Sequence, residues 1–126
     1  MEDRYLFKGK RLDNGEWAEG LPSYDEDGEI EEIEVWDGED IAFYPVFPGT
    51  ICQCTGLKDK NGKLIWENDV VKINNSKVNT LITFRDFEII CTIPNEKYYK
   101  HRLEYDTEYE VVGNIFDNPE LLESEG

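Results

Sequence analysis

Short runs in which apolar and polar side chains alternate limit the fold of this chain more than any other feature of its sequence. The clearest run covers residues 77–85, where one face carries Val78, Thr80, Ile82 and Phe84. The same period continues in residues 87–93, where one face carries Phe87, Ile89, Cys91 and Ile93. A two-residue period is typical of strands, so the two runs predict an antiparallel pair. No segment shows a long helical period, and the chain is therefore predicted to be mainly β.

Asn-Gly pairs divide further short runs and predict two hairpins. Asn14-Gly15 separates residues 5–11 from residues 16–18, and Asn61-Gly62 separates residues 57–58 from residues 64–66. Asn-Gly supplies the two positive φ angles of a type I′ turn, so we expect that turn in both hairpins. The segment 58–63 then forms a solvated hairpin tip.

The remaining segments complete a small β architecture. Residues 69–73 and 109–112 are predicted strands, and residues 97–103 form a short helix or a loop. Asn118-Pro119-Glu120 places an N-cap residue, a proline and an acid at the start of a short C-terminal helix. We predict a small barrel or barrel-like antiparallel sheet from the second half, with the N-terminal β-hairpin packed on it, as one domain over residues 1–126.

The segment 22–48 is acidic and contains prolines, and its structure is left open between two alternatives. Ile33 and Val35 alternate with acids, which suits an edge strand with one wet face. Thirteen acids between Asp13 and Asp40 repel one another, which suits a mobile loop equally well. Pro45 and Pro48 are expected to end any regular element before Gly49.

The charge of the chain excludes several classes of function. The formal net charge is −16, residues 1–40 alone carry fifteen acids and four bases, and residues 12–57 contain no Lys or Arg. Direct binding to nucleic acid or to an anionic membrane needs clustered cations, so neither is expected. The acids predict a protein-interaction surface at Glu29, Glu31, Glu32, Glu34, Trp36, Glu39 and Asp40.

A basic protein is the expected partner of such a surface, and its attraction should weaken as salt screens the charges. One alternative is a self-assembling structural module, a homo-oligomer with no separate target. Another is an acidic DNA mimic that occupies the basic groove of a nucleic-acid-binding protein. In a fourth interpretation the charge only keeps a small protein soluble.

Catalytic, metal and cofactor sites are not predicted. A nucleophilic triad would have to use His101, which lies in a polar stretch. Cys52 and Cys54 lack a second ligand pair at zinc spacing, unless Cys91 and His101 complete it. The acidic run 25–29 resembles a calcium loop but lacks the spacing of an EF-hand, so calcium binding there stays open.

The cysteines and the apolar runs bear on where the protein works. Three cysteines do not form a disulfide framework, so we expect reduced thiols, and Cys52 and Cys54 should point the same way on a strand. The first residues show no secretory signal, and no apolar run reaches the length of about 20 residues that crosses a bilayer. A cytoplasmic location is expected.

Three blocks of sequence together resemble the YopX family of phage and prophage proteins. They are FKGKRLDNGEWAEG at residues 7–20, QCTGLKDKNGKLIWENDVVKI at residues 53–73, and YEVVGNIFDNPELL at residues 109–122. The chain departs from the family pattern at Asn68-Asp69, where Gly-Asp is usual, and at Cys52 and Cys54, where a Gly and an aromatic residue are usual. Asn tolerates left-handed geometry, so the turn at Asn68 should survive.

The resemblance implies a mainly β fold and a phage or prophage accessory protein in a bacterial cell, without an assigned catalytic or binding residue. Its basic partner would then be a host or phage protein, and the self-assembling alternative would have no host target. The recurrent Gly, Asn and Asp positions are expected to act in turns, and the recurrent apolar positions on strand faces. Because the first and third blocks both form strands, we expect them to share one sheet.

Overall fold

The computed structural model describes residues 5–85, 88–92, 101–102 and 108–122, and the chain in it is mainly β, as predicted. It divides into two compact units, Met1–Cys54 and Thr55–Gly126. The single domain over residues 1–126 stays a prediction. Within the described residues, no helix is both long enough and apolar enough to cross a membrane.

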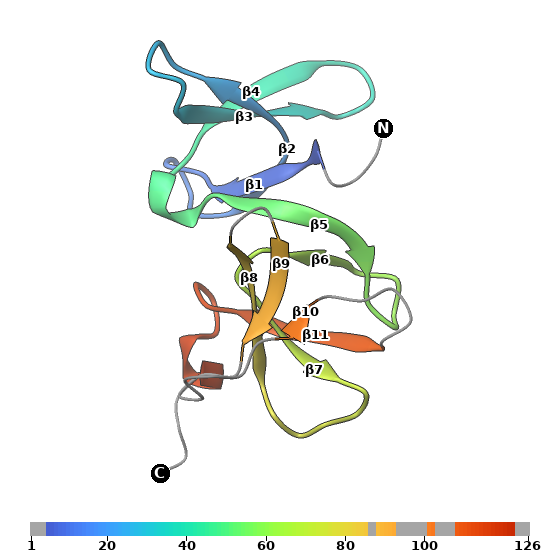
Figure 1. The fold of residues 1–126 in the computed structure, drawn as a ribbon. Coiled ribbons are helices and arrows are strands. Elements are labelled where there is room, and N and C mark those ends of the chain that lie inside the picture. Colours follow the sequence, from blue (N-terminus) through green and yellow to red (C-terminus); the bar gives the residue numbers. More distant parts are fainter. Residues whose placement is uncertain (1–4, 86–87, 93–100, 103–107, 123–126) are drawn as a thin grey trace. The chain divides into compact units, whose positions relative to one another are not determined.

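The first unit is an antiparallel sheet in the order β4-β3-β2-β1-β5 (Figure 1). Its strands are β1 (Phe7–Lys10), β2 (Trp17–Tyr24), β3 (Ile30–Trp36), β4 (Ile41–Pro45) and the first residues of β5 (Cys52–Lys58). A turn of 3₁₀ helix, η2 (Pro48–Thr50), precedes β5. The predicted N-terminal hairpin is confirmed as β1 and β2, with Phe7 opposite Gly20 and Lys10 opposite Trp17.

Of the two alternatives for this segment, the strand around Ile33 is present as β3 and the loop is not. Its predicted position at the edge of the sheet is wrong, because β3 pairs on both sides, with β2 and with β4. The edge is β4, which the sequence did not predict. Pro45 ends β4 opposite Glu32, where its carbonyl accepts the N–H of Leu12 at 2.9 Å, and a proline fits at the end of an edge strand because no ladder bond to β3 needs its N–H. The segment 22–48 contains the end of β2, all of β3 and β4, and the first residue of η2.

The turns of both predicted hairpins differ from type I′. Among the described residues, positive φ without glycine occurs at Asn68, Asn74 and Asn75, so Asn14 and Asn61 are not left-handed, while Gly15 and Gly62 are. In the first turn the N–H of Arg11 bonds to the carbonyl of Glu16 at 2.8 Å, which makes a four-residue loop. A loop longer than the two-residue type I′ turn needs one left-handed residue, and Gly15 or Gly62 supplies it.

The core of the first unit forms on one face of this sheet. Ala18, Ile33 and Val46 are buried, and partly buried neighbours pack against them, namely Phe7, Ile30, Val35, Tyr44 and Ile51. An isolated bridge pairs Arg11 with Val46, so the ends of β1 and β4 come together. Gly9 permits this approach, since a Cβ there would lie 2.9 Å from Cβ of Val46.

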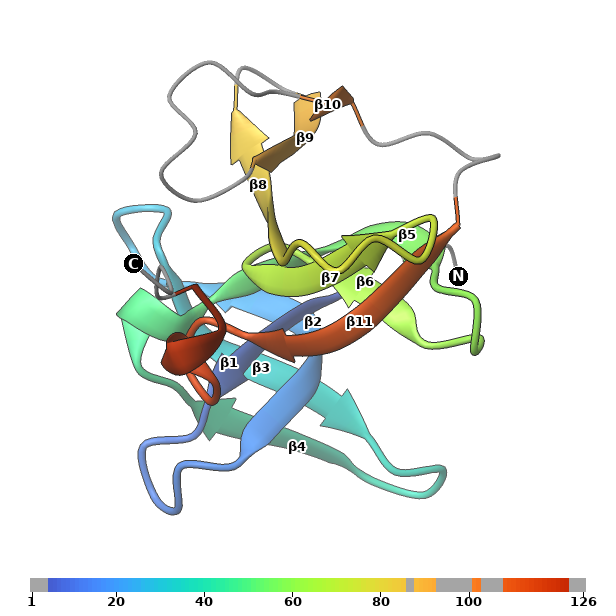
Figure 2. The same ribbon diagram turned by 90° about the horizontal axis from the view of Figure 1, so that it is seen from below.

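The second unit contains an open antiparallel sheet in the order β10-β9-β8-β7-β11 (Figure 2). Its strands are β7 (Asp69–Ile73), β8 (Thr80–Arg85), β9 (Glu88–Thr92), β10 (His101–Arg102) and β11 (Tyr109–Asn114). The predicted pair is confirmed as β8 and β9, with Ile82 opposite Cys91. In the predicted helix or loop over 97–103, His101 and Arg102 instead form the strand β10, and the other residues lie outside the described ones.

The prediction that the first and third blocks share a sheet is wrong, because β11 pairs with β7. Sequence order does not fix such pairing, and β7 and β11 match through their own apolar positions, Val71 opposite Val111. The predicted C-terminal helix is present as one 3₁₀ turn, η3 (Pro119–Leu122). The core of this unit comprises Ile65, Val71, Ile82, Cys91 and Tyr109.

The second hairpin joins β5 to β6 (Leu64–Trp66), and its tip is only partly solvated. Asp59 is 7% exposed, and its Oδ1 accepts the N–H groups of Asn61 and Lys63 at 2.9 Å each. Its Oδ2 accepts the N–H of Val111 at 3.0 Å. Burial disfavours the charged form, but these three donors outweigh it and hold the pKa of Asp59 below its ordinary value.

Candidate functional site

The outward face of the β3–β4 hairpin exposes large apolar side chains. Trp36 is 70% exposed, Ile41 55% and Phe43 52%. The register places Trp36 opposite Ile41 and Glu34 opposite Phe43, so the four side chains form two neighbouring rows. With Glu32 in the next row, opposite Pro45, these residues are called the hairpin face.

Strand period explains why these side chains point outward. Ile33 is fully buried and Val35 packs against the core, so the residues between and beside them, Glu32, Glu34 and Trp36, fall on the opposite face. Sequence reasoning found Trp36 but missed Ile41 and Phe43. The run 41–45 is apolar throughout, and no alternation within it indicates which residues face out.

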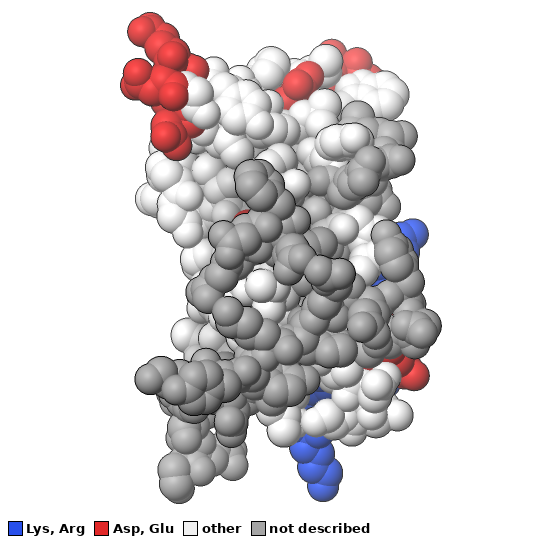
Figure 3. Space-filling view, viewed as in Figure 1, with Lys and Arg blue, Asp and Glu red and all other residues white. Residues whose placement is uncertain are grey.

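The predicted interaction residues do not form one surface. Glu39 and Asp40 lie in the turn after Trp36, beside the hairpin face, whereas Glu29 and Glu31 lie at the other end of β3. Seven strand residues span about 20 Å, so the two ends are separate sites. Figure 3 shows the acids gathered in the same way, over the β2–β3 loop at upper left and near the β3–β4 turn at upper right.

A bulge sets the direction of Glu31. The register runs from Ser23 opposite Glu32 to Tyr24 opposite Ile30, which leaves Glu31 as the extra residue. Glu31 consequently lines an open groove of about 650 Å³ at this end of the first unit. The groove is lined by Leu12, Asp25, Glu29, Ile30, Glu31, Pro45, Val46, Pro48 and Ile51.

The turn beside the hairpin face keeps its charge. Oδ1 of Asp37 accepts the N–H groups of Glu39 and Asp40 at 2.9 Å each. The donors from Asp40 and Glu39 lower the pKa of Asp37 from its ordinary value. Asp37 is therefore ionised at neutral pH and adds a negative charge to the turn.

Three cations on the described part of the first unit lie over aromatic rings. Nζ of Lys8 lies 4.5 Å from the ring centre of Trp17, and Nζ of Lys10 lies 5.4 Å from it. Cζ of Arg11 lies 3.9 Å from the ring centre of Tyr44, and Arg11 also pairs with Asp13 at 2.6 Å. None of these three cations lines the groove.

The calcium-like run 25–29 has a geometry that its own hydrogen bonds explain. Oδ1 of Asp25 accepts the N–H groups of Asp27 at 2.9 Å and Glu29 at 3.0 Å. Gly28 has a φ of +81°. Across residues 5–85, 88–92, 101–102 and 108–122, no three His, Cys, Asp or Glu side chains are grouped so that they could hold a metal ion.

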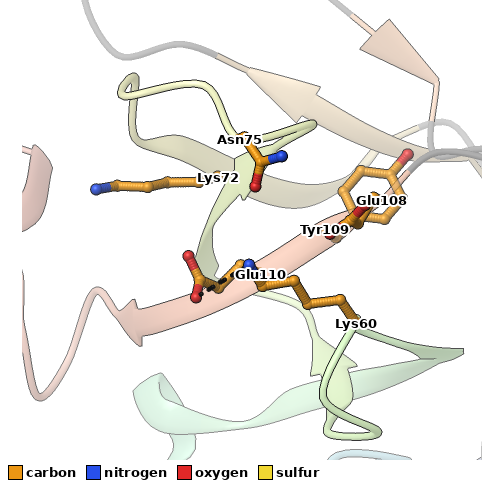
Figure 4. Close-up of a pocket in the computed structure, with 6 residues that line it drawn as sticks. All are labelled: Lys60, Lys72, Asn75, Glu108, Tyr109 and Glu110. Carbon is orange, nitrogen blue, oxygen red and sulfur yellow. Dashed lines mark ion pairs between the residues drawn. The ribbon is translucent and has the colours of Figure 1, made fainter.

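A pocket in the second unit has room for about one water molecule, with a volume near 10 Å³ (Figure 4). It is lined by Lys60, Lys72, Asn75, Glu108, Tyr109 and Glu110. Nζ of Lys60 and Oε2 of Glu110 form an ion pair at 3.6 Å, drawn as a dashed line in Figure 4. The pocket is too small for an organic ligand.

The three cysteines are buried thiols outside any disulfide. Cys52 and Cys54 are both buried on β5, which agrees with the prediction that they point the same way on a strand. The backbone of His101 is paired with that of Cys91, which is fully buried. Burial raises the pKa of the Cys91 thiol to about 12, so the thiol is protonated at neutral pH and is a poor nucleophile.

Comparison with known proteins settles the family. The model of the family described as YopX protein matches residues 5–123. The chain belongs to the YopX family. A solved structure, "Crystal structure of protein EF1440 from Enterococcus faecalis", is similar with a TM-score of 0.59 and 25% identity, over 93% of this chain and 96% of that one. No curated protein matches.

The motifs that resemble the YopX family stabilise turns and close contacts. Asn68 has a φ of 72°, which confirms that asparagine keeps the left-handed turn. Oδ2 of Asp69 accepts the N–H of Trp66 at 2.8 Å. In the last block, a Cβ on Gly113 would lie 2.5 Å from Oδ1 of Asn118, so any other residue there would push the side chains of Asn118 and Leu121 away from β11.

Proposed function

We propose that this YopX-family chain is a phage or prophage accessory protein that acts by binding a basic partner protein, in the bacterial cytoplasm and without catalysis. The hairpin face carries the proposal. Exposed Trp36, Ile41 and Phe43 stand in adjacent rows with Glu34, and apolar side chains clustered on a wet surface are typical of interaction sites.

The chemistry of the face indicates the partner. Trp36 offers a flat ring to an Arg or Lys side chain, and Glu34, Asp37, Glu39 and Asp40 surround it with negative charge. The apolar rows supply contact area, while the acids steer a basic protein into place. A basic partner with an apolar centre fits this face.

Capture from a bacterial lysate tests the proposal. Immobilised wild type should retain a protein that salt at about 0.5 M releases, since such salt shortens the Debye length to about 4–5 Å. Trp36→Ala should lose that protein. Tyr24→Ala is the matched control, because Tyr24 is 57% exposed but lies at the far end of β2. Equal capture by wild type and Trp36→Ala would contradict the proposal.

The free edge of β4 supports the second candidate, self-assembly. Asp37 donates its N–H to Asp40, so ladder bonds alternate and the backbone groups of Ile41 and Phe43 point away from β3. An open edge can pair with another copy. Sedimentation over a range of concentrations tests this: a dimer that Phe43→Pro dissolves would favour assembly over a separate partner.

A further inference from the structure

The groove at the opposite end of β3 combines an apolar floor with an acidic rim. Its floor is formed by Val46, which is 3% exposed, and by half-buried Ile30 and Ile51, all parts of the core cluster. Leu12 stands 53% exposed at its side. A volume of about 650 Å³ lies in the range of roughly 300–1,000 Å³ that ligand sites occupy, so the groove can take more than one side chain.

The rim offers acceptors and few donors. Asp25, Glu29 and Glu31 contribute three carboxylates, and no Lys or Arg lines the groove. The N–H groups of the β2–β3 loop are already bonded within the loop. Those of Asp27 and Glu29 donate to Oδ1 of Asp25, and that of Asp25 donates to the carbonyl of Glu29. Pro45 and Pro48 have no N–H at all. A ligand that fits must bring donors and positive charge.

The carboxylates do not gather as metal ligands within the described residues, so a single small cation does not match them. Spread carboxylates suit an ammonium or guanidinium group that reaches several acceptors, and the apolar floor suits a neighbouring aliphatic side chain. Both groups occur together in an extended peptide.

We propose that the groove binds an extended segment of a partner protein in which an apolar side chain adjoins a Lys or Arg. This inference rests on the proposed function, that the chain acts by binding a basic protein, and it adds a second contact surface. The apolar side chain lies on Ile30 and Val46, and the cation bonds to Glu29 and Glu31.

A defined peptide tests the groove directly. The probe is a fluorescent, capped Gly-Lys-Leu-Arg-Gly peptide, titrated with the full chain at about 50 mM salt, where the Debye length is about 14 Å. The double variant Glu29→Gln/Glu31→Gln should raise Kd about fivefold or more. Glu16→Gln/Glu19→Gln removes the same charge from exposed positions of the first unit that line neither the groove nor the hairpin face, and it should leave Kd within about twofold.

The apolar floor is tested by changing either side of the contact. Leu12→Ser alters an exposed side chain, so folding is unaffected, and it should raise Kd about threefold. A Gly-Lys-Ser-Arg-Gly probe should bind wild type more weakly by a similar factor. If both double variants weaken binding equally, or if the two probes bind alike, the attraction is general and the inference is overturned.

Lysate capture separates this inference from the proposed function. Loss of a partner in Trp36→Ala but full retention in Glu29→Gln/Glu31→Gln would overturn the groove and keep the proposed function. Peptide binding that depends on Glu29 and Glu31, in a chain that captures no protein, would overturn the proposed function instead. If sedimentation shows a dimer that Glu29→Gln/Glu31→Gln dissolves, a second copy occupies the groove and the inference is overturned.

Discussion

The β2–β3 loop and the β5–β6 loop are built in the same way but are anchored differently. Each begins with an aspartate, Asp25 or Asp59, whose Oδ1 accepts the N–H groups two and four residues on. Each has a glycine at +81° in the fourth position, Gly28 or Gly62. The first loop is exposed throughout, whereas Asp59 is buried and reaches β11.

The difference lies in two long-range hydrogen bonds. Oδ2 of Asp59 accepts the N–H of Val111 at 3.0 Å, and the N–H of Lys60 bonds to the carbonyl of Tyr109 at 2.8 Å. Identical local chemistry therefore gives a free acidic tip in one unit and an anchor in the other. The comparison separates what an Asp-x-x-Gly loop does alone from what its surroundings add.

Replacing the aspartate should show the largest difference in stability between the two loops. In Asp59→Asn, the amide can still accept two N–H groups but leaves that of Val111 unpaired, so the free energy of unfolding should fall by about 2 kcal/mol. Asp25→Asn should change it by less than about 0.5 kcal/mol, since the exposed loop can turn to water. Urea unfolding of both variants measures this, and equal losses would show that the anchor adds nothing.

The contribution of Asp59 should also appear in the pH dependence of stability. The pKa of Asp59 is lowered in the folded chain, so its stabilisation is complete above the ordinary value of about 3.9 and is lost as pH falls through the folded pKa. In Asp59→Asn, the free energy of unfolding should therefore fall less steeply as the pH is lowered through this range. Unfolding curves from neutral pH to about pH 2 test it. The same acid dependence in the variant and the wild type would count against the anchor.

Replacing the glycine should lower the free energy of unfolding equally in the two loops. An added Cβ would meet nothing within 4 Å at Gly28 or Gly62, so only the left-handed φ opposes alanine. Gly28→Ala and Gly62→Ala should each lower the free energy of unfolding by about 1 kcal/mol. A much larger loss at Gly62 would place the difference between the loops in the backbone rather than in the carboxylate.

The surface charge of the anchored loop should matter least. Lys60 pairs with Glu110 at 3.6 Å, with side chains 32% and 40% exposed. Lys60→Gln should change the free energy of unfolding by no more than about 0.5 kcal/mol, because water and salt screen such pairs. A greater loss would mean that the ion pair, not Asp59, holds the loop to β11.

Local patterns predicted much of the fold, because the formation of strands and turns depends mainly on residues that are close in the sequence. The hairpins at Asn14-Gly15 and Asn61-Gly62, the β8–β9 pair and the left-handed Asn68 followed from alternation and turn chemistry. The wrong predictions involve choices between turn types or between partners. A two-residue and a four-residue loop share the same Asn-Gly signal.

The candidate sites were predictable only in part. Trp36 and its neighbouring acids were found from charge, but Ile41 and Phe43 lie in an apolar run whose outward residues only pairing with β3 reveals. The groove is lined by Leu12, Glu31 and Pro48, among others. These residues lie far apart in the sequence, so no local pattern predicts that they come together. The contact of Asp59 with Val111 spans 52 positions and could not be predicted from either segment alone.

The three buried cysteines make the chain a reporter of its own opening. Cys52 and Cys54 lie on β5 and Cys91 on β9, each at most 1% exposed. A thiol reagent can reach these sulfurs only when a strand separates, so labelling rates measure local unfolding without any added probe. Mass spectrometry that resolves the labelled positions would time the release of β5 and β9 separately, in the unaltered sequence.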